Sequence, residues 1–154
     1  MIISEILSSE AILTSIKASS KKRVLQEISV GIANVYDLNQ SEVFFALQER
    51  ENLGPTGMGH GVAIPHARIS SLKSIKGLFA KLKKPLDFGS MDGQNVDLIF
   101  VLIAPHDSGA NHLKALAKVS RILRNRSTCE KLRSTGDKLA LYSILTTDKE
   151  IQAA

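Results

Sequence analysis

The sequence Val-Asp-Leu-Ile-Phe-Val-Leu-Ile-Ala, from Val96 to Ala104, is the most apolar run of the chain. It is short and rich in β-branched residues, and Pro105 follows it, so it favours a strand over a buried helix. An almost continuously apolar strand is typical of a sheet that is covered on both faces. We therefore expect this strand to be central, with helices on either side.

Apolar residues at helical or strand spacing recur before and after this run. Ser19 and Ser20 are candidate helix N-caps, and Asn39 followed by Glu42 has the spacing of a capping box. A strand at 77–82 is expected to close at the Lys-Lys-Pro sequence 83–85. The expected strands are 11–16, 62–64, 77–82 and 96–104, and the expected helices are 20–37, 39–54, 107–123 and shorter segments within 128–145. Because helices and strands mix throughout, the sequence predicts an α/β fold in three layers.

The composition is that of an ordinary globular protein, with 44% hydrophobic and 23% charged residues. No repeat or linker divides the chain, so residues 1–154 are expected to form a single domain, with 148–154 as a frayed tail. Cys129 is the single cysteine and cannot form an internal disulfide. A positively charged leader and an apolar run of membrane-spanning length are both missing. We expect a cytoplasmic protein that does not insert into a membrane.

The net charge of +5 raises the question of an anionic partner. Aromatic residues make up only 5% of the chain and there is no tryptophan, so stacking on nucleic-acid bases is poorly supported. Lys114, Lys118 and Arg121 form a basic stripe on the helix expected after the central strand. We interpret the stripe and the net charge as a solvated surface, and we expect no nucleic-acid partner.

The segment from Leu53 to Arg68 has a flexible half followed by a stiff one. Its first half contains four glycines, which leave backbone N–H groups accessible. In its second half Pro65 restricts its own φ angle and biases Ile64 toward an extended conformation, so His66 should leave the strand in a fixed pose. A glycine-rich loop that leads to a rigidly held imidazole suits the binding or transfer of a phosphoryl group.

The four histidines are His60, His66, His106 and His112, and we expect His60 and His106 to be ordinary. His112 lies in the first turn of a helix, where free N–H groups favour an anion. Helix starts and strand ends gather at one edge of an α/β sheet, so His66 and His112 can meet. A zinc site from His60, His66 and His112 is an alternative, but no short ligand pair supports it. The glycine loop lacks the Gly-Lys-Ser/Thr ending of a Walker A motif, so nucleotide binding is disfavoured. A cysteine hydrolase is also disfavoured, because no histidine is suggested as a partner for Cys129.

The sequence from Arg50 to His66, Arg-Glu-Asn-Leu-Gly-Pro-Thr-Gly-Met-Gly-His-Gly-Val-Ala-Ile-Pro-His, resembles the enzyme IIA proteins of the bacterial phosphotransferase system, fructose/mannitol type. The likeness continues through 85–88, 92–94, 96–100 and 112–116, and it is greatest to the nitrogen-related, regulatory branch. It implies an α/β sandwich with a mixed sheet flanked by helices.

The resemblance also implies the roles of several residues. His66 matches the phosphoryl acceptor, and Arg50 and His112 match the phosphate-stabilising arginine and the second active-site histidine. The expected phosphate-binding residues of the loop are Thr56, Gly59 and Gly61. Pro55 and His60 stand where small polar residues are more usual.

The implied function is that of a phosphohistidine carrier and regulator, an intermediate in phosphoryl transfer rather than a metabolic enzyme. Its donor would be an HPr-like phosphocarrier of the nitrogen type, and its targets could include potassium-transport proteins or sensor kinases. No cofactor, metal or nucleotide is expected. Two alternatives stay open: a sugar-specific enzyme IIA that passes phosphate to the IIB domain of a permease, and a binding module whose histidines never carry phosphate.

Overall fold

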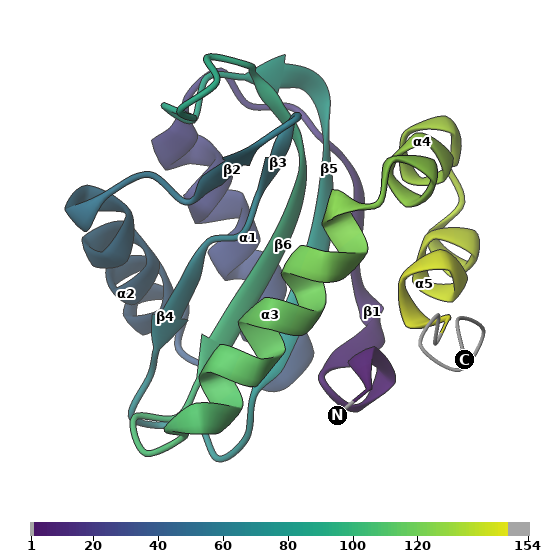
Figure 1. Ribbon diagram of the computed structural model, residues 1–154. Coiled ribbons are helices and arrows are strands. Elements are labelled where there is room, and N and C mark those ends of the chain that lie inside the picture. The colour runs from purple at the N-terminus through teal and green to yellow at the C-terminus, as the bar shows by residue number, and fades with distance from the viewer. Residues whose placement is uncertain (1, 148–154) are drawn as a thin grey trace.

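The computed structural model describes residues 2–147, which form a six-stranded mixed sheet with helices on both faces (Figure 1). The strands are β1 (Leu7–Ile16), β2 (Gly57–Gly59), β3 (Val62–Ala63), β4 (His66–Arg68), β5 (Lys76–Leu86) and β6 (Val96–Ala104). The helices are α1 (Lys21–Tyr36), α2 (Gln40–Leu53), α3 (Ala110–Arg124), α4 (Arg126–Ser134) and α5 (Lys138–Thr146), and the 3-10 helix η1 (Ile3–Glu5) precedes β1. The expected α/β fold in three layers is confirmed.

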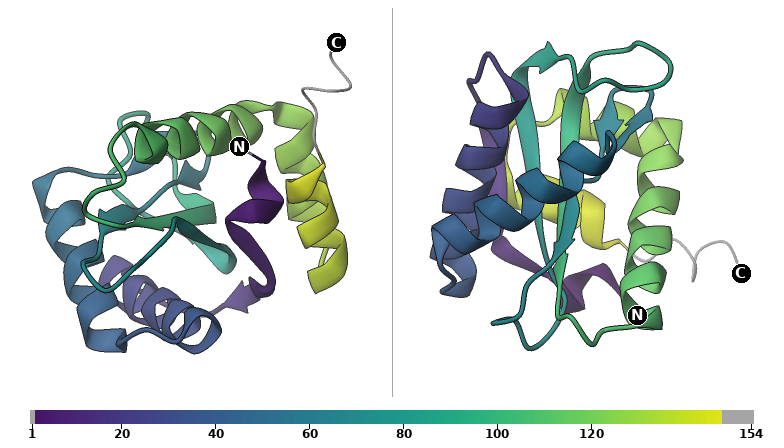
Figure 2. Two further views of the ribbon diagram at one scale, coloured as in Figure 1. Left: turned by 90° about the horizontal axis from the view of Figure 1, so that it is seen from below. Right: turned by 90° about the vertical axis from the view of Figure 1, so that its left-hand side faces the viewer.

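Strand β6 is the centre of the sheet, as its apolar sequence predicts. It pairs antiparallel with β5 on one side and parallel with β3 and β4 on the other, in the order β1-β5-β6-β3-β2. Every residue of β6 except Asp97 is buried. Helix α3 covers one face of the sheet, and α1 and α2 cover the opposite face (Figure 2). Helix α5 packs against the edge strand β1.

The two helices of the α1–α2 layer begin at the residues that the sequence indicates. The Ser20 side chain accepts a hydrogen bond from the Arg23 amide, and Asn39 accepts one from the Glu42 amide at 2.9 Å. Caps of this kind each stabilise a helix by about 1 kcal/mol. Since α2 begins at a defined residue and packs on β4, the residues of its last turn reach the sheet edge in a fixed place.

Two local predictions were wrong in their boundaries. Strand β5 does not close at Pro85 but continues to Leu86, because its pairing with β6 is irregular between Lys81 and Leu86 and a proline without an N–H is tolerated there. Strand β1 begins at Leu7, ahead of the expected 11–16. The expected tail, 148–154, lies outside the described residues. No helix within residues 2–147 is long and apolar enough to cross a membrane.

The glycine segment is more ordered than a loop. Gly57–Gly59 forms β2, which pairs antiparallel with Val62–Ala63 as a small hairpin on the sheet. The chain then leaves the sheet for two residues, and His66 opens the separate strand β4 where it pairs with Leu102 of β6. His66 is therefore held by the sheet itself, and not only by the proline before it.

Candidate functional site

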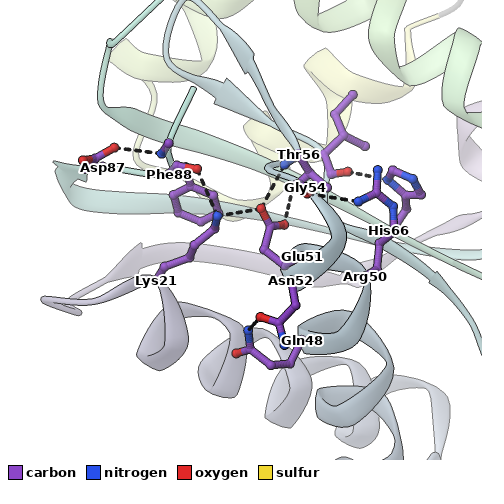
Figure 3. Close-up of polar contacts among 12 residues, drawn as sticks. Lys21, Gln48, Arg50, Glu51, Asn52, Gly54, Thr56, His66, Asp87 and Phe88 are labelled. Carbon is purple, nitrogen blue, oxygen red and sulfur yellow. Dashed lines mark hydrogen bonds and ion pairs between the residues drawn. The ribbon is translucent and has the colours of Figure 1, made fainter. Parts of the chain in front are cut away.

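The imidazole of His66 has a defined orientation at the start of β4. Its Nδ1 atom lies 2.8 Å from the carbonyl oxygen of Ile64 (Figure 3). A carbonyl oxygen only accepts hydrogen bonds, so in the neutral ring Nδ1 carries the proton and Nε2 carries the lone pair. Pro65 restricts the backbone between the two residues, which keeps the ring next to this carbonyl. The nitrogen left available for chemistry is Nε2.

The surroundings of His66 favour this neutral form. Burial lowers the pKa of the His66 imidazole below its ordinary value of 6.5, and the charge of Arg50 lowers it further. The hydrogen bond to Ile64 and the charge of Glu51 act in the opposite direction, and the net effect is a lowered pKa. At pH 7 the ring is neutral and nucleophilic.

His112 meets His66 from the other side of the site. It is the third residue of α3, and its ring centroid lies 5.7 Å from that of His66, with the ring planes inclined by 73°. The residue is only 6% exposed, and its Nε2 atom has no hydrogen-bond partner among the described residues. Buried polar atoms usually have a partner, so an oxygen-bearing group between the two rings would satisfy this nitrogen. Burial, His66 and Arg68 all lower the pKa of His112.

Two arginines line the same cavity. Arg50 lies in the last turn of α2 and donates from Nη1 to the carbonyl of Gly54 at 3.0 Å, and Arg68 donates to the carbonyl of His106 at 2.8 Å. The cavity has a volume of about 550 Å³. Its lining consists of Ala46, Glu49, Arg50, Leu53, His66, Ala67, Arg68, His112, Leu113 and Leu116.

Arg68 is a residue that the sequence analysis missed. Alternate residues of a strand point to the same face, so the spacing of two from His66 along β4 could have placed Arg68 beside it. The cavity thus holds two guanidinium groups and two neutral imidazoles, with Glu49 as the one acidic residue of its lining. Such a set of donors and nucleophile fits a phosphoryl group.

A buried carboxylate, also missed from the sequence, fixes the loop beside the site. The side chain of Glu51 is 2% exposed, and its carboxylate lies 2.7 Å from the Lys21 ammonium. It accepts hydrogen bonds from the amide of Thr56 at 2.9 Å and from its hydroxyl at 2.5 Å (Figure 3). The carbonyl of Thr56 accepts from the amide of Ile64, whose own carbonyl holds His66. A continuous chain of hydrogen bonds therefore leads from α1 to the imidazole.

The three loop residues expected to bind phosphate lie in other surroundings. Thr56 uses both of its donors on Glu51. Gly59 and Gly61 have φ angles of 94° and 80° in the β2–β3 hairpin and do not line the cavity of His66. A Cβ atom at Gly61 would lie 2.5 Å from an Arg133 nitrogen, so this glycine makes room for that side chain. A direct role of these residues in phosphate binding stays a prediction.

Arg133 of α4 connects the turn of this hairpin to strand β6 through hydrogen bonds. It donates to the Asp97 carboxylate at 3.0–3.1 Å and to the carbonyl of His60 at 2.9 Å. His60 itself is exposed and lies outside the cavity, and His106 contributes its carbonyl to Arg68. Within residues 2–147 no group of three His, Cys, Asp or Glu side chains has the arrangement of a metal site.

Comparison with known proteins gives consistent matches. Residues 5–148 match the family of the phosphoenolpyruvate-dependent sugar phosphotransferase system, EIIA 2. A nitrogen regulatory protein of Bradyrhizobium diazoefficiens is 49% identical over 94% of this chain and 95% of its own length. The crystal structure of the nitrogen regulatory protein IIA-Ntr from Neisseria meningitidis has a TM-score of 0.88 at 35% identity, covering 94% of this chain and 99% of that one. The IIA mannitol structure from Escherichia coli shares the fold, with a TM-score of 0.76 at 21% identity over 90% of this chain and 97% of that one.

Proposed function

This chain belongs to the EIIA 2 family of the phosphoenolpyruvate-dependent sugar phosphotransferase system, and we propose that it is a phosphohistidine carrier of the nitrogen-related branch. It accepts a phosphoryl group on His66 from an HPr-like phosphocarrier and controls its partners through its phosphorylation state. The observation that carries this proposal is the pose of His66, whose Nδ1 is bound to Ile64 and whose ring lines a cavity with Arg50 and His112.

Phosphoryl transfer to His66 requires a neutral ring with a free lone pair. The Nε2 atom attacks the phosphorus of the donor phosphohistidine, and the new N–P bond forms as the bond to the donor imidazole breaks. The donor nitrogen retains the electron pair of the broken bond. The proton on Nδ1 of His66 stays on that nitrogen, which continues to donate to the carbonyl of Ile64. Transfer of this kind depends mainly on in-line positioning and on stabilisation of charge.

Arg50, Arg68 and His112 supply that stabilisation. A protein-bound phosphoryl group carries about −1.5 to −2 charges. A guanidinium presents a planar set of N–H donors that matches phosphate oxygens. Arg50 uses Nη1 for its hydrogen bond to Gly54, and its other N–H groups can donate to a phosphoryl group. The unpartnered Nε2 of His112 binds another oxygen of the group when it carries the ring proton. The chain of hydrogen bonds through Glu51 keeps the acceptor ring in place.

The regulatory function follows from the change in charge. The phosphoryl group adds negative charge to a cationic cavity, so a partner that fits one state is disfavoured by the other. The relatives named as nitrogen regulatory proteins support the nitrogen-related branch. Potassium-transport proteins or sensor kinases as targets have no support in these comparisons and stay a prediction.

The test is carrier-dependent phosphorylation with mapping of the modified residue. We expect the wild type to take up acid-labile phosphate from a phosphorylated HPr-like carrier, and His66→Ala to take up none. His106→Ala is the matched control and should be phosphorylated normally. A wild type that accepts no phosphate from either a nitrogen-type or a sugar-type carrier contradicts the proposal. Faster transfer from the sugar-type carrier would assign the chain to the sugar-specific alternative.

A further inference from the structure

The excess of positive over negative charge in this protein lies in one segment. Residues 108–129 contain five Lys or Arg and no Asp or Glu, whereas the remainder of the chain contains fifteen of each sign. The whole net charge of +5 therefore lies in this segment, most of which is helix α3. The five cations are Lys114, Lys118, Arg121, Arg124 and Arg126.

Helix α3 turns one face toward the sheet and another toward solvent. Its buried side chains are His112, Ala115, Val119 and Leu123. Lys114, Arg121 and Arg124 are exposed, and we call these three residues the cationic face of α3. The helix lies on the outside of the sheet (Figures 1 and 2).

The cationic face begins at the rim of the His66 cavity. Leu113, the neighbour of Lys114 in the helix, lines that cavity and is 67% exposed. Leu53 lines it from α2 and is 85% exposed. Two exposed leucines at the rim of a reactive pocket form an apolar surface that a protein partner can cover, and Lys114 is the next residue of α3 after Leu113.

We propose that the cationic face of α3 is the docking surface for an acidic face of the phosphocarrier that donates to His66. This inference rests on the proposed function and adds the charge of the partner to it. A donor that brings its phosphohistidine to His66 must cover the cavity rim, and so it lies beside Lys114. Opposite charges there steer the encounter and raise the association rate by about 10- to 1,000-fold in favourable cases.

The charges also favour release after transfer. Before transfer the donor carries the phosphoryl group and is at its most negative, opposite a cationic surface. After transfer the donor has lost about two negative charges and this protein has gained them. Attraction between the two surfaces therefore falls at the moment when the carrier has to leave.

A protein partner fits this surface better than a nucleic acid. Base stacking mostly uses Phe, Tyr or Trp side chains, and α3 contains none of these. The apolar side chains of Leu53 and Leu113 would gain little from contact with a charged phosphate backbone. An apolar centre with a charged periphery is instead typical of an interface between proteins.

The experiment measures phosphoryl transfer from the phosphorylated nitrogen-type carrier as a function of salt. We expect Lys114→Glu to lower kcat/KM about fivefold at low ionic strength, with kcat at saturating carrier unchanged, since steering acts on the encounter. The difference should shrink by about 0.5 M salt, where the Debye length falls to about 4 Å. The matched control is Lys138→Glu, an exposed lysine of α5 beyond the opposite, β1 edge of the sheet, which makes the same change in net charge. It should change kcat/KM less than twofold.

Several outcomes would overturn the inference. If Lys114→Glu and Lys138→Glu lower kcat/KM equally, the net charge of the protein and not the cationic face determines the rate. If Lys114→Glu speeds transfer, the face of the carrier that docks there is basic. An unchanged rate in Lys114→Glu, with the wild type phosphorylated normally, removes α3 from the interface but leaves the proposed function intact. A DNA duplex that binds the wild type and not Lys114→Glu, with transfer unaffected, assigns the face to nucleic acid. A wild type that accepts no phosphate removes both proposals.

Discussion

Under the proposed function, the protonation of His66 decides when this site can accept a phosphoryl group. Only the neutral ring has a lone pair on Nε2, and burial with Arg50 lowers the pKa of His66 below 6.5. The rate of phosphoryl uptake should therefore be constant around pH 7 and fall as the pH drops through the lowered pKa. The measurement is the rate of transfer from pH 5 to pH 8, next to an NMR titration of the His66 ring. A midpoint above 6.5 would contradict this account of the site.

His112 should assist transfer without being the acceptor. Its buried Nε2 has no hydrogen-bond partner within residues 2–147 and is available for a phosphoryl oxygen. Replacing His112 by Ala should slow transfer by about 100-fold, the usual cost of losing one stabilising donor, while phosphate still maps to His66. His106→Ala, outside the cavity, controls for the loss of an imidazole. Equal rates in the wild type and His112→Ala would exclude His112 from the mechanism.

Arg68 should act on His112 through its charge. The guanidinium is one of the causes that lower the pKa of His112. Arg68→Gln should therefore raise the pKa of His112, whereas Arg124→Gln, another exposed arginine that donates to a carbonyl, should leave it unchanged. NMR titration of the His112 ring in the three proteins makes the comparison. A pKa that does not move in Arg68→Gln would mean that this arginine does not act on the ring.

At the scale of elements, Glu51 joins helices α1 and α2 to the loop before the site. Its buried carboxylate accepts from Lys21 and twice from Thr56, and removing it leaves these donors without their acceptor. Glu51→Ala should lower the free energy of unfolding by about 2–3 kcal/mol, measured by urea denaturation. Glu49→Ala, an exposed neighbour on the same helix, should cost less than about 0.5 kcal/mol. Similar losses in both variants would show that the Glu51 contacts contribute little.

At the scale of the whole molecule, the sheet is continuous, α1, α2, α3 and α5 pack on it, and α4 packs on α3 and α5, so we expect one cooperative unfolding unit. Tyr36 in α1 and Tyr142 in α5 lie on separate helices, and there is no tryptophan to dominate the fluorescence. Tyrosine fluorescence and far-UV circular dichroism should give coincident urea transitions, as in two-state domains. Separate midpoints for the two probes would divide the chain into more than one unit and contradict the single-domain prediction.

Much of this architecture could be predicted because its signals are local. The apolar run of β6 indicates a strand buried on both faces, and Ser20 and Asn39 mark helix starts through contacts with residues three positions away. The end of β5 could not be predicted in the same way. Proline usually ends a strand because it has no N–H to donate to the neighbouring strand. In β5 the pairing with β6 is irregular at this point, so no such hydrogen bond is lost, and this pairing between distant segments is not visible in the local sequence.

The sequence by itself was enough to predict which residues carry the proposed chemistry. The Gly-Val-Ala-Ile-Pro-His motif points to His66, and the family resemblance adds Arg50 and His112. Only the tertiary structure decided how these groups are held. It binds Nδ1 of His66 and so leaves Nε2 as the nitrogen available for chemistry, it buries Nε2 of His112 without a hydrogen-bond partner among the described residues, and it places Arg68 in the cavity. The physical reason is that orientation, burial and pKa depend on atoms far apart in the chain, which come together only when the sheet and its helices have packed.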